Sequence, residues 1–143
     1  MPHPKELAQQ FLAALAANDA AQYEAVLSED AALRLGRWDG SELYRPRRRV
    51  VPRFLDEWSA WPDPILEKFT VMAEGDKIAI EFRIQVTEND RYVEHNRSAF
   101  LTIKDDKIHV IDLYCNEPIP GAGRKGWIAP VTLTEAELRH DVL

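Results

Sequence analysis

Residues 92–116, YVEHNRSAFLTIKDDKIHVIDLYCN, decide the fold class of this 143-residue chain. The stretch reads as two β-strands joined by a two-residue turn at Asp105-Asp106, because aspartate tolerates the positive φ angles that such turns need. In this register Ile103 faces Ile108, and side chains alternate between the two faces of the hairpin from there. One face is then apolar near the turn and ionisable at the far end. This pattern predicts a pocket with an apolar floor and a polar cluster at one end.

The ionisable end of that face contains the residues that we predict to be catalytic: Asp112, Arg97, His95 and Tyr114. A carboxylate in an apolar strand suits a general acid or base, and Arg97 could hold it ionised or bind an oxyanion. The open alternatives are a purely structural ion pair between Asp112 and Arg97, or an Asp112 side chain on the solvent face. His95 titrates near neutral pH as a residue type, and Tyr114 can donate a hydrogen bond to a ligand oxygen. Exposure of the histidine and simple packing of the tyrosine are the competing interpretations.

We expect aromatic side chains and one amide to complete the substrate-binding wall: Trp38, Tyr44, Phe11, Trp58 and Asn116. Aromatic residues at helical spacing are more often core residues, whereas a tryptophan in a loop favours a pocket rim. No cluster of histidine and acidic residues has metal-ligand spacing, so we expect no metal site. The chain also lacks a phosphate-binding loop and a dinucleotide fingerprint, so we expect no cofactor.

The composition, 45% hydrophobic and 29% charged, is that of a globular protein. We expect one domain over residues 1–143, with a core at about 4–117 and a C-terminal extension over 118–143. No apolar run approaches ~20 residues, so no membrane span is expected. The lone cysteine, Cys115, excludes an internal disulfide and favours a cytoplasmic location. The net charge of −6 argues against nucleic acid as the main partner.

Positive charge is concentrated in residues 34–53, which contain seven arginines and only two acidic residues. Neutralisation by carboxylates elsewhere in the protein is the favoured explanation. The minority hypothesis is that these arginines attract an anionic substrate towards the mouth of the pocket.

Apolar periodicity predicts helices before strands. Helices are expected at residues 4–17, shortly after Asn18-Asp19, and at 47–60 with Pro52 in the first turn. Residues 31–35 read as a short strand, 36–45 as a loop, and the strands up to the hairpin alternate apolar and polar residues. Thr134 with Glu137 could begin a last short helix. Helices followed by antiparallel strands predict an α+β fold with helices on one face of a sheet.

Three segments, QQFLAALAAND at 9–19, LSEDAAL at 27–33 and IKDDKIHVIDLYCN at 103–116, resemble the SnoaL-like branch of the NTF2-like superfamily. The resemblance implies a cone in which N-terminal helices pack on a strongly curved, mostly antiparallel sheet that encloses a pocket. Ketosteroid isomerases, polyketide cyclases and limonene epoxide hydrolases share this fold. Because the superfamily hosts many chemistries, the resemblance carries fold more than function.

The family's functional positions carry over only in part. Ketosteroid isomerases have a tyrosine where this chain has Phe11 and a base near Leu35, which argues against their chemistry here. Cyclases and epoxide hydrolases have an acid on the last strand, which falls on Asp112 or, one residue later, on Leu113. The epoxide hydrolase Arg-x-Asp pair is replaced by His95-x-Arg97, so that triad is incomplete.

The residues and the resemblance together predict a cofactor-independent enzyme of isomerase, cyclase, dehydratase or epoxide hydrolase type. Its substrate would be a small apolar oxygenated molecule. The alternative is a non-catalytic module that binds a small molecule or another protein. We also expect a homodimer through the outer face of the sheet, formed by the apolar residues of the face opposite Asp112: Phe100, Ile111, Leu113 and Cys115.

Overall fold

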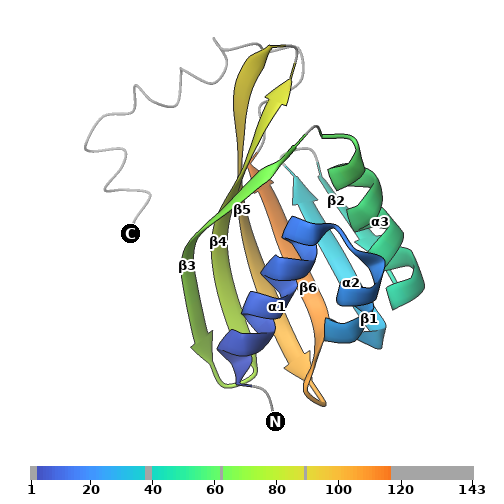
Figure 1. Cartoon of the computed structure of the whole chain (residues 1–143). Helices are drawn as coiled ribbons and strands as arrows, with labels where there is room; N and C mark the ends of the chain where they lie inside the picture. The colour runs from blue at the N-terminus through green and yellow to red at the C-terminus, as the bar shows by residue number, and fades with distance from the viewer. Residues whose placement is uncertain (1–2, 38–39, 62, 89, 117–143) are drawn as a thin grey trace.

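A six-stranded sheet with helices on one side forms the protein in a computed structural model, which describes residues 3–37, 40–61, 63–88 and 90–116 (Figure 1). The helices are α1 (Pro4–Ala17), α2 (Ala20–Val26) and α3 (Arg47–Ser59). The strands are β1 (Leu27–Arg37), β2 (Gly40–Tyr44), β3 (Ile65–Glu74), β4 (Lys77–Glu88), β5 (Arg91–Lys104) and β6 (Lys107–Asn116). The predicted α+β class is therefore confirmed.

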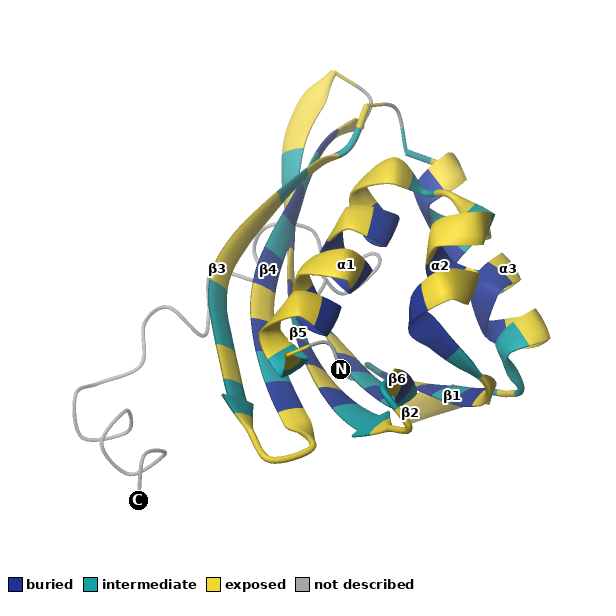
Figure 2. Ribbon diagram, turned by 60° about the horizontal axis from the view of Figure 1, so that its bottom comes forward, coloured by how far each residue is buried: buried dark blue, intermediate teal, exposed yellow. Residues whose placement is uncertain are grey.

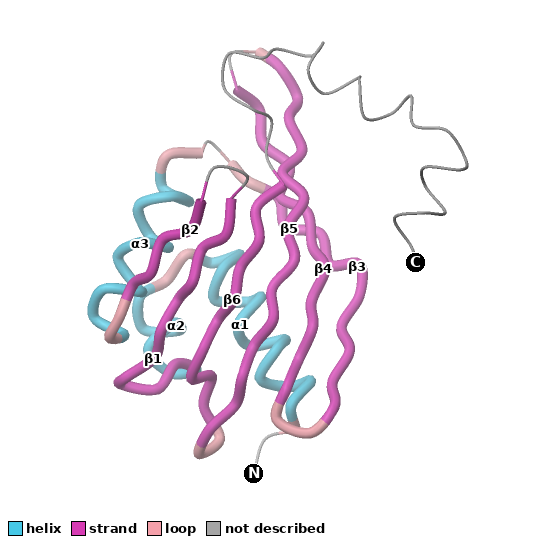
Figure 3. Tube along the Cα trace, turned by 180° about the vertical axis from the view of Figure 1, so that it is seen from behind, coloured by secondary structure: helices cyan, strands magenta, loops and turns pink. Residues whose placement is uncertain are grey.

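The strands lie in the order β2-β1-β6-β5-β4-β3, and only the β1–β6 pair is parallel. The helices cover one face, where the buried side chains gather (Figure 2). Seen from behind, the opposite face has no helix over it among the described residues (Figure 3). The sheet therefore has a concave face towards the helices and an open face, which bear different residues.

The helices follow the sequence signals closely. α1 begins with a capping box in which His3 accepts from the Lys5 N–H and Glu6 accepts from the His3 N–H, and it ends at Asn18 with φ 48°. Its inward residues, among them Phe11, are buried at helical spacing. No helix within the described residues is long and apolar enough to cross a membrane.

Two expectations about the middle of the chain are wrong. The predicted loop at 36–45 contains β2, because residues 40–44 complete an antiparallel ladder with the end of β1. Pro52 lies inside α3 and not in its first turn. Proline lacks the N–H that would bond the carbonyl of Arg48 one turn earlier, so α3 lacks that hydrogen bond at Pro52.

The hairpin turn is as predicted, but the register beyond it is not. Asp105 and Asp106 have φ of 53° and 62°, and Ile103 pairs with Ile108. The next pair on the ladder is Thr102 with Val110, so His109 is one extra residue on β6. Such a β-bulge reverses the facing of every later side chain on its strand.

The bulge residue has its own contacts, which explain its position. The Nδ1 atom of His109 lies 3.2 Å from the hydroxyl of Ser28 and 3.3 Å from a carboxylate oxygen of Asp30. Both partners lie where the β1–β6 register is also irregular, between Leu27 and Ala32. A hydrogen bond from Ser28, followed by smaller effects that include the charge of His109, lowers the pKa of Asp30.

The reversed facing changes which residues reach the core. Ile111 and Leu113 are buried on the concave face, whereas Phe100 is half exposed on the open face. The predicted outer patch of Phe100, Ile111, Leu113 and Cys115 is therefore wrong as a single surface. A shared core of helix and strand residues fills the space under the helices: Phe11, Leu15, Tyr23, Leu33, Leu35, Phe54, Trp58, Ile80, Phe82, Ile84, Leu101 and Ile111.

Candidate functional site

Two polar residues of β5 are buried on the concave face. His95 is 7% exposed and Arg97 is 3% exposed, and they are the buried polar or charged residues of the described chain. They continue the row that Ala99 and Leu101 occupy nearer the turn, because alternate residues of a strand share a face. The predicted change from apolar to ionisable along this face is therefore present on β5.

Helix α3 supplies the carboxylate that meets this row. Arg97 donates a hydrogen bond from Nη1 to Oε1 of Glu57, in the last turns of the helix. The side chain of Arg97 is 1% exposed and that of Glu57 is 15% exposed, so the ion pair is shielded from water. The pair joins the end of α3 to the middle of the sheet.

A second arginine approaches the same carboxylate from one helical turn earlier. The Nη1 atom of Arg53 lies 3.5 Å from Oε2 of Glu57, and its Nε donates to the Tyr44 hydroxyl at 3.3 Å. Tyr44 in turn donates to Glu42. Glu57 therefore lies between two guanidinium groups, which stabilise its charge.

The indole of Trp61 covers the buried polar pair. Its ring stacks on the His95 imidazole, with centroids 4.8 Å apart and planes at 22°, and lies 5.4 Å from Cζ of Arg97. Trp58 packs edge-to-face against the same indole at 5.9 Å. The cluster of Glu57, His95, Arg97 and Trp61 is the concave-face cluster referred to below. Its aromatic cover reduces water access and strengthens the electrostatic contacts beneath.

The charge of Glu57 also affects Tyr23, a tyrosine in the core. Burial raises the pKa of Tyr23 well above its usual range, and the charge of Glu57 raises it further. The Tyr23 hydroxyl donates to the side-chain oxygen of Asn18 at 3.4 Å, and its ring stacks on Phe54 at 5.3 Å. Tyr23 is therefore a neutral hydrogen-bond donor at ordinary pH, placed behind the ion pair.

The four predicted catalytic residues do not lie together. Arg97 and His95 lie on the concave face, whereas Asp112 and Tyr114 lie on the open face. The prediction that Asp112, Arg97 and Tyr114 share one face is wrong, because the bulge at His109 reverses β6 but not β5.

Asp112 and Tyr114 have clear structural contacts where they lie. Asp112 forms an ion pair with Arg34, its register partner on β1, in which Oδ1 of Asp112 lies 3.2 Å from Nη1 of Arg34. The Tyr114 ring lies over the backbone of Gly36, where an added Cβ would come within 2.8 Å of it. The same ring packs edge-to-face on Phe100 at 5.9 Å. Both residues therefore stabilise the open face of the sheet.

The predicted substrate-binding residues are also dispersed. Phe11 and Trp58 are 0% and 2% exposed and pack in the core, while Tyr44 is half-buried beside Arg53. Asn116 ends β6 opposite Asn96, with its side chain outside the described residues. Trp38 lies outside the described residues altogether. Ligand contact by any of the five stays a prediction.

Sequence reasoning missed Glu57, Arg53 and Trp61. Glu57 falls on the inward stripe of α3 between Phe54 and Trp58, and Trp61 extends that stripe past the end of the helix. A charged residue within an apolar helical stripe is a usable signal, because such a side chain is buried only with a partner.

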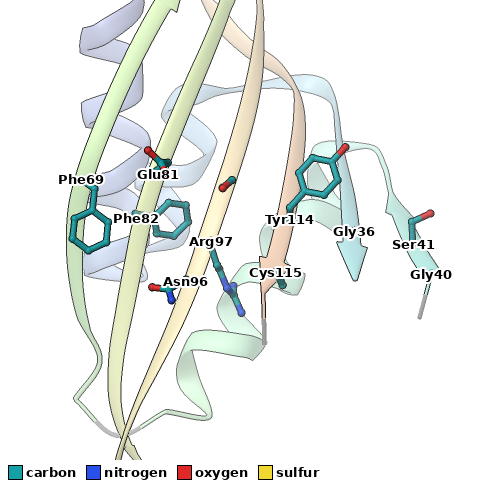
Figure 4. Close-up of a pocket in the computed structure, with 11 residues that line it drawn as sticks. Gly36, Gly40, Ser41, Phe69, Glu81, Phe82, Asn96, Arg97, Tyr114 and Cys115 are labelled. Carbon is teal, nitrogen blue, oxygen red and sulfur yellow. The ribbon is translucent and has the colours of Figure 1, made fainter. Parts of the chain in front are cut away.

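The open face also has a hollow, of about 770 Å³ (Figure 4). It is lined by residues of all six strands, among them Phe69, Glu81, Asn96, Ser98 and Tyr114, and Arg97 of the concave-face cluster also contributes to its lining. Tyr114 lies in this hollow and not in the predicted concave pocket. Across the part of the chain that the structure describes, no group of three or more histidine, cysteine or acidic side chains is placed to hold a metal.

Comparison with known proteins identifies the fold. Neither a family model nor a curated protein sequence matches the chain. Solved structures do match the chain. IdmH from Streptomyces antibioticus, provisionally assigned as a polyketide cyclase, superposes with a TM-score of 0.71 at 15% identity, covering 80% of this chain and 93% of its own.

Two further structures give the same result. A protein from Kribbella flavida, provisionally assigned as a ketosteroid isomerase, has a TM-score of 0.63 at 22% identity, with 85% of each chain covered. A SnoaL-like protein from Jannaschia, provisionally assigned as a polyketide cyclase, has a TM-score of 0.63 at 10% identity, covering 77% of this chain and 85% of its own. The chain therefore has the SnoaL-like variant of the NTF2-like fold, as its sequence resemblance implied.

Proposed function

We propose that this protein is a cofactor-independent enzyme that transfers protons on a small, largely apolar molecule with an oxygen function, at the concave-face cluster. The observation that supports the proposal most is the burial of an ion pair and an imidazole together, under an indole, on the concave face of the sheet. The SnoaL-like fold of the chain is consistent with this class of enzyme.

The energetics of the ion pair favour a functional interpretation. Removing a guanidinium and a carboxylate from water costs several kcal/mol per ion, and apolar side chains of similar volume often pack as stably. Stability alone therefore does not require Glu57 and Arg97 at these positions. Buried ionisable groups gather where a site needs proton carriers or charge stabilisers.

The residues suit distinct roles. His95 is the proton carrier, because an imidazole both accepts and donates protons near neutral pH. Arg97 stabilises an oxyanion such as an enolate, and Glu57 positions the guanidinium through their hydrogen bond. Phe82 and Ile84 pair with Arg97 and His95 on β4 and are buried, so the surroundings of the two polar side chains are apolar.

The reaction types consistent with these roles are isomerisation, aldol-type cyclisation, dehydration and epoxide opening. Asp112 and Tyr114 have no part in this revised site, since they lie on the open face. Glu57 is the carboxylate paired with Arg97, and His95 takes the proton-transfer role that was expected for Asp112.

A second function is favoured by one specific observation. The positions where ketosteroid isomerases place their acid–base groups are Phe11 and Leu35, which are 0% and 2% exposed within the core. A protein without those groups could bind its ligand unchanged. Arg97 would then act only as a hydrogen-bond donor to the ligand oxygen.

Hydrogen–deuterium exchange separates the two functions without knowledge of the substrate. A cyclic enolisable ketone such as 2-tetralone, incubated in D₂O, exchanges its α-protons faster if the protein transfers protons. We expect wild-type protein to accelerate exchange and His95→Gln to lower that acceleration by about 10²-fold. Asp112→Asn, on the open face, is the matched control and should keep the wild-type rate.

Two results would contradict the proposal, the first by excluding catalysis and the second by excluding the site. Exchange no faster than in buffer, together with ketone-induced NMR shifts at His95, would identify a binding module. Equal loss of rate in His95→Gln and Asp112→Asn would show that the concave-face cluster is not the site.

A further inference from the structure

A second hollow lies outside the concave-face cluster, between β2 and the solvent-facing side of α3. It measures about 710 Å³, within the range of small-molecule sites. Four arginines and one carboxylate residue are among the residues that line it. The full lining is Leu43, Tyr44, Arg45, Arg48, Arg49, Pro52, Arg53 and Asp56. We call it the arginine hollow.

The arginines of this region divide into engaged and unengaged groups. Arg53 is bound by Tyr44 and Glu57 and approaches Glu42 at 4.0 Å. Arg47, which does not line the hollow, donates to the carbonyls of Glu24 and Leu27 at 3.3 and 3.1 Å. These two arginines have structural roles.

The remaining three arginines differ. Arg45, Arg48 and Arg49 are exposed, and among the described residues no carboxylate lies within ion-pair distance of them. Asp56 is the carboxylate that lines the same hollow, so the lining has a net positive charge. The sequence predicted that carboxylates elsewhere in the chain neutralise the arginines. Within the described structure, no carboxylate neutralises these three side chains.

The start of α3 adds to the positive potential. Its N-cap is Pro46, which provides no side-chain hydrogen bond, and its first turn has no acidic residue. Positive side chains at this end oppose the helix dipole, and a bound anion relieves the opposition.

We propose that the arginine hollow binds a small organic phosphate through Arg45, Arg48 and Arg49. Guanidinium groups bind phosphate oxygens through two parallel hydrogen bonds, and a doubly charged group is matched by several of them. The apolar parts of Leu43, Tyr44 and Pro52 line the same hollow and provide a surface for the organic body. The hollow adjoins the concave-face cluster through Arg53, which lines the hollow and contacts Glu57, but Arg45, Arg48 and Arg49 do not belong to that cluster.

An NMR titration with phenyl phosphate tests the proposal, with inorganic phosphate and benzoate as comparison probes. We expect saturable binding of phenyl phosphate, with shifts at the backbone amides of Leu43, Arg45, residues 47–51 and Arg53. Arg48→Gln with Arg49→Gln should weaken binding by about tenfold or more. Inorganic phosphate should bind more weakly than phenyl phosphate because it lacks the apolar body.

The matched control removes two exposed arginines outside the hollow, Arg34→Gln with Arg91→Gln. Its net charge equals that of the site variant, and its affinity should stay within about twofold of wild type. Equal weakening in both variants would show general electrostatic attraction and overturn the site. Binding without saturation, or shifts centred elsewhere, would overturn it as well. Benzoate binding as tight as phenyl phosphate would overturn the ligand class. Thermal unfolding of each variant confirms that it is folded.

Discussion

The two faces of the sheet each have an arginine–carboxylate pair, and the pairs differ in every property that matters energetically. Arg97–Glu57 lies on the concave face with its side chains 1% and 15% exposed. Arg34–Asp112 lies on the open face with its side chains 60% and 25% exposed. The same chemistry is therefore a shielded pair on one face and a solvated pair on the other. Residue type alone does not distinguish a candidate site from a surface contact.

One residue decides which pair is shielded. With His109 as the extra residue of β6, Ile111 and Leu113 face the helices and Asp112 faces outward. Without it, alternation would turn Asp112 and Tyr114 towards the core and expose the two apolar residues.

Deletion of His109 should therefore have the largest effect of any single change. The free-energy cost of exposing Ile111 and Leu113 while burying Asp112 is comparable with the total stability of a typical domain, about 5–15 kcal/mol. We expect the deletion variant not to fold, as measured by circular dichroism and by amide NMR dispersion. His109→Ala keeps the residue count and should fold. A deletion variant with wild-type thermal unfolding would show that the bulge does not set the facing of β6.

Breaking each ion pair tests the comparison directly. Glu57→Gln should lower the free energy of unfolding by about 3 kcal/mol, because it leaves a buried guanidinium without this carboxylate. Asp112→Asn should lower it by less than about 1 kcal/mol, since its pair is solvated. Urea titrations of both variants provide the measurement.

A double variant identifies the reason for the larger loss. Glu57→Leu with Arg97→Met should recover much of the stability that Glu57→Gln loses, because apolar partners remove the desolvation cost. Equal destabilisation by Glu57→Gln and Asp112→Asn would contradict the distinction between the faces.

The apolar residues of the open face give a prediction about association. Large hydrophobic side chains exposed there are Leu43, Phe69, Met72, Phe100 and Tyr114. We expect them to form a homodimer interface, and Phe100→Asp to shift the protein towards monomer. Sedimentation should show a species of about twice 16.4 kDa for wild type. A 16.4 kDa species alone at micromolar concentration would contradict the dimer.

Gly36 offers a smaller test of packing on the open face. A Cβ at this position would lie 2.8 Å from Cδ1 of Tyr114, whose side chain is half exposed and can move. Gly36→Ala should therefore cost about 1 kcal/mol. In a Tyr114→Ala background the same change should cost nothing, which a double-mutant cycle measures. An unchanged cost in that background would exclude the tyrosine as the cause.

The smallest expected effect is the pH dependence at the bulge. The hydrogen bond from Ser28 lowers the pKa of Asp30 in the folded protein. The ionised Asp30 carboxylate therefore contributes its full stabilisation at pH values above its unfolded pKa, about 4. That contribution is lost as the pH falls through the lower folded value. Asp30→Asn should make the melting temperature slightly less sensitive to pH below about 4. An identical acid profile in Ser28→Ala would show that the hydroxyl is not the source.

The sequence alone determined most of the elements and the fold class. The ends of α1, the Asp105-Asp106 turn and the alternation along β4 and β5 depend on local caps, turn preferences and periodicity, and each lies where it was predicted. The SnoaL-like resemblance was likewise readable from three short segments. These features persist because neighbouring residues specify them.

Only the tertiary structure decided the site. At the bulge His109 contacts Ser28 and Asp30, about eighty residues earlier in the chain, and the bulge reversed the facing of Asp112 and Tyr114. The partner of Arg97 is Glu57, forty residues away on α3. Alternation along a strand fixes which side chains share a face only while the register is unbroken. The pairing of Glu57 with Arg97 under Trp61 is a long-range contact, so it could be found only in the folded protein.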